Sequence, residues 1–148
     1  MLDRDVVSTL NALIETAKGG EKGFALAVKA SKDPVLIRVF GEGEHACRDA
    51  TLQLQDSVRL LGGHADVGGS MKAAAHRGWL SLMNAMSSRG SLAILEEREK
   101  GEDYAKTRYA DAMKLDLPEG VRALLERQYQ GVIANHDRIR DLRNQYRA

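Results

Sequence analysis

Apolar residues recur at alternating spacings of four and three along several long stretches of the chain. In residues 118–146 the repeating positions are Val121, Leu125, Gln128, Val132, Asn135, Ile139, Leu142 and Tyr146. This spacing places all of them on one side of a helix, as in a coiled-coil seam. The same spacing runs from Val6 to Ser31 and from Leu36 to Leu61. Each stretch is therefore predicted to be a long amphipathic helix.

Capping and turn signals give the ends of these helices. Asp33-Pro34 is an N-cap acid followed by proline at the first helical position, and Gly62-Gly63 ends the stripe that follows. The predicted helices cover about 3–31, 34–61, 70–87, 91–115 and 118–146. Gly19-Gly20 lies inside the first helix. Since each glycine costs about 1 kcal/mol in a helix interior, we expect a local bend or break there.

The lengths of the connections predict the architecture. The first and second long helices are joined by a very tight turn, as are the third and fourth, while nearly 30 residues separate the second from the third. One long crossover between two antiparallel helix pairs is the ferritin-like arrangement. We therefore predict an all-α, ferritin-like four-helix bundle of one domain, residues 1–148, with the short helix 70–87 inside the crossover.

Composition excludes several classes of protein. Hydrophobic residues make up 43% and charged residues 29%, which is a globular balance. A net charge of +1 argues against a nucleic-acid partner, and no apolar run approaches the ~20 residues of a membrane span. The N-terminal MLDRDVVSTL is not a signal peptide, and the single Cys47 fits a reducing compartment. We expect a cytoplasmic protein without nucleic-acid or membrane partners.

Four phrases carry a resemblance to a known family: LNALIETAKGGEKGF, AAAHRGWLSL, AILEEREKGEDYA and VRALLERQYQGVIANHDRIRDLR. Together they resemble a bacterial family of ferritin-like four-helix-bundle proteins that is described only as a domain of unknown function. The resemblance covers essentially the whole chain. It implies the bundle fold and a cytoplasmic protein, and it implies no activity.

One Glu-x-x-His motif, Glu42-Gly43-Glu44-His45, matches the ligand pattern of ferritin-like di-iron sites. Such sites need carboxylates and imidazoles that all point into the bundle. On the helical wheel His45 lies about 180° from the apolar stripe, and Glu42 about 120° from it. We therefore interpret the motif as part of a solvated polar face.

A second set of residues flanks the apolar stripes at similar heights, with one residue from each long helix. It consists of Glu21, Glu44, Glu102 and His136. Arg98, Gln128 and Asn135 lie near the same level and complete a polar layer in the bundle core.

This layer has two interpretations. In the first it is structural, with Arg98 paired to Glu102 one helical turn away and the amides fixing the register. In the second it is a reduced iron or manganese site. The nearby Arg98 disfavours a cation, and Ile133 stands where a di-iron site would have a glutamate three residues before His136. We expect no bound cofactor, with iron or manganese as the alternative.

No serine elbow, Cys-x-x-Cys or phosphate-binding glycine loop is present. We therefore expect a protein that is not an enzyme and acts through association with itself, as a homodimer or other homo-oligomer, or with a partner protein. Apolar residues at the edges of the stripes would allow this, namely Val7, Ile14, Leu52 and Ile133. The alternative is a metal-binding or oxidative-stress protein.

Overall fold

The computed structural model describes residues 3–65 and 90–147, which form four long helices. These are α1 (Asp3–Ala30), α2 (Pro34–Leu60), α4 (Ser91–Met113) and α5 (Glu119–Arg147). Their ends differ from the predicted ones by at most two residues. The helix predicted over 70–87 lies outside the described residues. Of the helices described, none combines the length and the apolar character that crossing a membrane requires.

The turn between α1 and α2 forms as the sequence predicts. Asp33 caps α2 by accepting a hydrogen bond from the Val35 backbone N–H at 2.8 Å, and Pro34 occupies the first turn. At the other end of the chain, the Tyr146 hydroxyl donates to the same Asp33 carboxylate. The cap of α2 is therefore tied to the last turn of α5.

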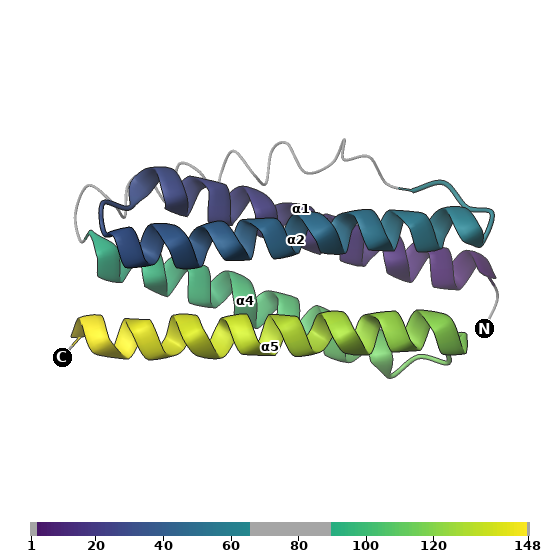
Figure 1. Ribbon diagram of the computed structural model, residues 1–148. Coiled ribbons are helices and arrows are strands. Elements are labelled where there is room, and N and C mark those ends of the chain that lie inside the picture. The colour runs from purple at the N-terminus through teal and green to yellow at the C-terminus, as the bar shows by residue number, and fades with distance from the viewer. Residues whose placement is uncertain (1–2, 66–89, 148) are drawn as a thin grey trace.

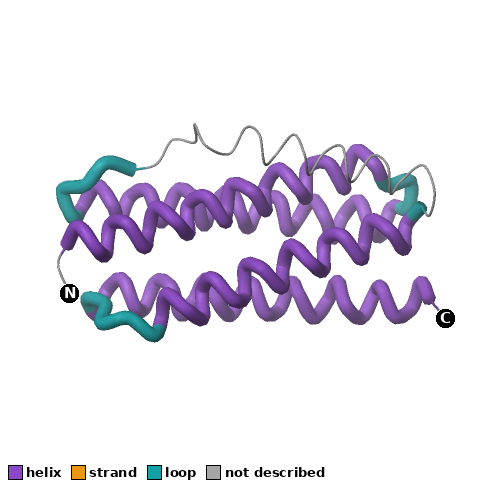
Figure 2. Tube along the Cα trace, turned by 180° about the vertical axis from the view of Figure 1, so that it is seen from behind, coloured by secondary structure: helices purple, strands orange, loops and turns teal. Residues whose placement is uncertain are grey.

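The four helices form a bundle of two antiparallel pairs, α1 with α2 and α4 with α5 (Figure 1). Helix α4 packs on α1, and α5 lies beside α2. Helix α2 ends at the opposite end of the bundle from the start of α4, so these two helices run in the same direction (Figures 1 and 2). The predicted all-α bundle with a single long crossover is confirmed.

The predicted break in α1 is wrong, because this helix continues without interruption across Gly19-Gly20. The reason is a close approach of α2. A Cβ atom added at Gly20 would lie 2.8 Å from the Cys47 Sγ atom. Glycine is therefore needed for packing, and the close fit of α1 against α2 offsets its low helix propensity.

The buried apolar residues form two separate clusters. One occupies the end of the bundle that holds Leu10, Leu54 and Leu125, and the other holds Phe24 and Ile139. Along every helix, a stretch with few buried apolar residues separates the two clusters. We call this middle layer the waist, and its residues are Gly20, Cys47, Arg98, Glu102, Asn135 and His136.

Candidate functional site

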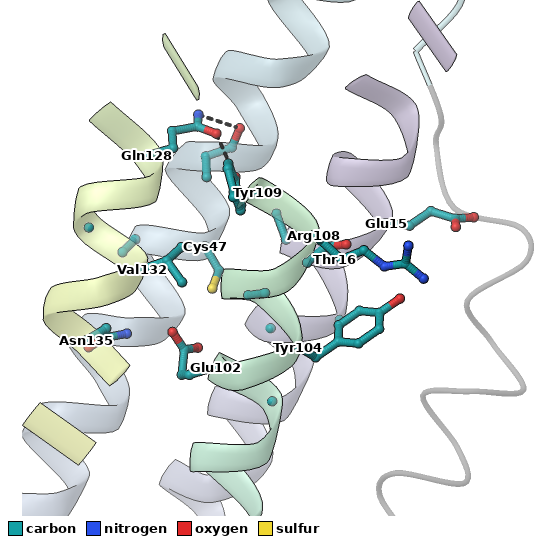
Figure 3. A pocket seen from close by; sticks show the side chains of 18 of the residues that line it. Glu15, Thr16, Cys47, Glu102, Tyr104, Arg108, Tyr109, Gln128, Val132 and Asn135 are labelled. Carbon is teal, nitrogen blue, oxygen red and sulfur yellow. Dashed lines mark hydrogen bonds between the residues drawn. The ribbon is translucent and has the colours of Figure 1, made fainter. Parts of the chain in front are cut away.

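A cavity of about 680 Å³ lies at the waist and is lined by residues from all four helices (Figure 3). Many of the lining residues are small: Gly19, Gly20, Ala46, Ala50, Gly101, Ala105 and Gly131. Small residues on facing helices leave space that larger side chains would fill. The volume lies within the roughly 300–1,000 Å³ typical of small-molecule sites.

Glu102 extends from α4 into this cavity, and Cys47 reaches it from α2 (Figure 3). Glu102 is only 4% exposed, and burial raises the pKa of its carboxyl from 4.5 to about 7. Attraction to Arg98 and His136 opposes that rise in pKa without cancelling it. Within residues 3–65 and 90–147, no hydrogen bond or ion pair reaches the Glu102 carboxylate. It is therefore a buried acid without a direct partner in that part of the chain.

Arg98 also lines the cavity, but its guanidinium packs between two glycines. A Cβ atom added at Gly23 would lie 2.5 Å from the Arg98 Cζ atom, and one at Gly101 would collide with Nη2. The Cζ atom lies 4.7 Å from the centre of the Phe24 ring. The Nη1 group is buried without a hydrogen-bond partner, and burial lowers the pKa of Arg98. The guanidinium acts on Glu102 through space, and the direct pair expected from the sequence is not formed.

The two other predicted carboxylates meet on the α1–α2 surface instead of in the cavity. Arg48 donates from Nε to Glu21 at 3.0 Å and from Nη2 to Glu44 at 3.2 Å. Both glutamate side chains are partly exposed. The structure therefore brings Glu21 and Glu44 together around a cation and separates them from Glu102.

His136 is 7% exposed and lies between two aspartates. Its Nε2 is 2.7 Å from the Asp103 carboxylate, and its Nδ1 is 3.0 Å from that of Asp137. Both ring nitrogens are therefore already engaged with carboxylates. The hydrogen bond with His136 is also the largest cause of the lowered pKa of Asp137.

The two amides of the α5 seam have different surroundings. Gln128 accepts a hydrogen bond from the Tyr109 hydroxyl at 2.7 Å and donates one to Gln53 at 3.0 Å (Figure 3). This network joins α2, α4 and α5 at the edge of the cavity. Asn135 lines the cavity near Glu102 (Figure 3). The polar layer is thus divided between a hydrogen-bonded part at Gln128 and a cavity part at Asn135.

The residues described here contain no group of three or more His, Cys, Asp or Glu side chains arranged to hold a metal ion. The Glu-x-x-His motif faces outward, as the helical wheel predicts. Glu42 pairs with Arg138 at 2.7 Å, and the largely exposed His45 pairs with Asp49 at 3.3 Å. Cys47 has a pKa raised to about 12 by burial, so its thiol stays protonated and unreactive.

The sequence matches the model of a known protein family. The family, described as "Domain of unknown function (DUF2383)", is matched by residues 5–115. The chain belongs to the DUF2383 family. The match covers α1, α2 and α4 and ends before α5. No curated protein matches the sequence.

Several features of this DUF2383 site were missed in the sequence. The cavity is one. A signal that could have indicated it is the helical spacing of small residues on the first three long helices: Gly19-Gly20, Ala46 and Ala50, Gly101 and Ala105. Arg48, which binds Glu21 and Glu44, is another. Its place one helical turn after Glu44 is a signal that could have indicated the pair. The partners of His136 were also missed, and only Asp137 is adjacent in the sequence.

Proposed function

We propose that this DUF2383 protein is non-enzymatic and acts by association, and that the molecule it binds is a small one held in the waist cavity. The observation that carries this proposal is the cavity itself, which meets the buried carboxylate of Glu102, a group without a direct partner among the described residues. An apolar pocket with a few convergent polar groups and a perturbed pKa is the usual form of a small-molecule site.

The groups around the cavity favour binding over chemistry. Burial raises the pKa values of Cys47 and Tyr109, so neither supplies an ionised nucleophile near neutral pH. Burial raises the pKa of Glu102 to about 7, and no nucleophile is hydrogen-bonded to it among the described residues. Covalent catalysis needs a nucleophile within hydrogen-bond reach of a base.

Association with a second copy or a partner protein has less support. The most exposed large apolar residues of α2 are Leu52 at 54% and Leu60 at 88%. Charged Asp56 and Arg59 lie between them, whereas the core of a protein interface is depleted in charges. Ile14, one of the residues expected at a contact surface, is fully buried. A small ligand is therefore the associated molecule that we propose.

A titration with cyclohexanol, a compact and mostly apolar probe, tests this proposal. We expect saturable shifts of the backbone amide signals of Gly20 and Gly101 in proton–nitrogen correlation spectra. Gly131→Leu should abolish them, because a side chain at that position enters open space at the cavity wall. Gly120→Leu is the matched control, since Gly120 is equally open but lies in the first turn of α5, away from the cavity. Equal binding by both variants, or none by the wild type, would contradict the proposal.

Iron or manganese binding is the alternative, with Glu102 and His136 as its buried members. The donor set fits poorly, because Arg48 already occupies Glu21 and Glu44 and two aspartates occupy His136. We predict that the purified protein retains no stoichiometric iron or manganese. Elemental analysis after aerobic and anaerobic preparation measures this. Retention of at least one equivalent through dialysis against a chelator would favour the metal function instead.

A further inference from the structure

The Glu102 carboxylate gives the cavity its chemical selectivity. Its side chain is 4% exposed and directed into the cavity (Figure 3). In the described part of the chain no N–H or O–H group donates to it. A buried carboxylate without donors is costly, and a bound group that supplies a donor recovers part of that cost. The cavity is therefore suited to a ligand that brings a hydrogen-bond donor to this carboxylate.

Arg98 does not supply that donor, although it lies on the same helix one turn away. Its guanidinium is held over Phe24 and fits between Gly23 and Gly101. The Nη1 group is buried and has no hydrogen-bond partner. An anionic ligand in the cavity could not reach Nη1 without moving the side chain out of this packing. Arg98 thus offsets part of the charge of Glu102 and leaves its oxygens open to the cavity.

The other charges at the waist do not favour an anion either. Both ring nitrogens of His136 are already engaged with the carboxylates of Asp103 and Asp137. Cys47, which faces Glu102 from α2, stays a neutral thiol. Residues of both signs also line the cavity: Glu15, Asp49, Arg108 and Arg127. The cavity lining as a whole therefore carries no strong preference for one sign of charge.

The remaining walls determine the body of the ligand. Glycine and alanine residues and Val132 line much of the cavity, and the surface of the cavity is mainly apolar. These walls offer apolar contact and few hydrogen bonds. A compact apolar group fits them and gains free energy by leaving water.

We propose that the waist cavity binds a small organic amine, whose apolar body lies against the glycine and alanine walls while its ammonium group donates to the Glu102 carboxylate. The proposal rests on the proposed function, that is, on the cavity accepting small molecules. It adds the chemical class of the ligand and names the residue that selects it.

Three probes that share one ring but differ in charge test the proposal: cyclohexylamine, cyclohexanol and cyclohexanecarboxylate. Their affinities are measured by the same amide shifts, at about pH 8, where Glu102 is ionised and an alkylammonium is still protonated. We expect the amine to bind at least about tenfold more tightly than the alcohol, and the carboxylate to bind most weakly. This order follows because only the amine brings a positive charge to the ionised carboxylate, whereas the carboxylate probe is repelled by it.

Glu102→Gln keeps the shape of the side chain and removes its charge. In this variant the preference for the amine should disappear, while the affinity for the alcohol stays within about twofold. Glu44→Gln is the matched control, because that carboxylate is bound to Arg48 and does not line the cavity. It should keep the preference of the wild type.

The results separate the two claims. If the alcohol binds as tightly as the amine, or if Glu102→Gln retains the preference for the amine, the amine proposal is overturned and small-molecule binding stands. If none of the three probes binds, the proposed function fails together with it.

Discussion

Glu102→Gln is expected to raise the free energy of unfolding by about 3 kcal/mol at pH 8. The reason is the pKa of this carboxyl, which burial raises from 4.5 to about 7 in the folded protein. Between about pH 4.5 and pH 7 the folded state holds a proton that the unfolded state has already released. The stability that this proton provides is fully present below about pH 4.5 and is lost as the pH rises through about 7. A glutamine cannot ionise and avoids this loss.

Chemical denaturation at several pH values between about 4 and 8 measures the effect. The wild type should lose stability over this interval relative to the variant, and the two should be similar at its acidic end. Glu44→Gln serves as control, because that side chain is partly exposed and its partner Arg48 is at the surface. Its effect should stay below about 1 kcal/mol. Parallel curves for the wild type and Glu102→Gln would show that Glu102 has an ordinary pKa.

Gly43→Ala is expected to destabilise the protein by about 1–2 kcal/mol, although alanine is the better helix former. A Cβ atom at this buried position would lie 2.7 Å from the ring of Phe24, which is fully buried. Phe24 also carries the guanidinium of Arg98 on its ring. Displacing the ring therefore disturbs the apolar cluster and the packing of the cation together.

Gly41→Ala in the same helix is the matched control for this prediction. No atom lies within 4 Å of its added Cβ, so only the gain in helix propensity remains. It should stabilise the protein by about 0.5–1 kcal/mol. Thermal or denaturant unfolding of the two variants gives the comparison. A stabilising effect of the same size in both would contradict the close approach of α1 and α2.

The sequence predicted most of the fold because the signals that determine it are local. The seam of α5, the Asp33-Pro34 cap and the connection lengths gave the helices, their ends and the single crossover. The break expected at Gly19-Gly20 was wrong because helix propensity describes an isolated helix. The contact between Gly20 and Cys47, which requires the glycine, joins two helices and has no local signal.

The candidate site was predictable only in part. Burial of Glu102 and His136 follows from their places beside the apolar stripes, and both are buried. The choice of partners could not be read from helical wheels. Glu21 binds Arg48 of the neighbouring helix, and this pairing depends on how α1 and α2 pack against each other. Likewise, the sequence placed Arg98 near Glu102. It could not show that the guanidinium would pack between two glycines instead of contacting Glu102.

The central claim is that Glu102 is a buried carboxyl that faces a cavity and has no direct partner in residues 3–65 and 90–147. A titration of its side-chain carboxyl carbon by NMR, assigned with Glu102→Gln, tests this claim most directly. We predict a pKa of about 7, which falls when cyclohexylamine is added because the ammonium group stabilises the ionised form. A pKa near 4.5 that is unchanged by the amine would contradict both the burial of this group and its role in binding.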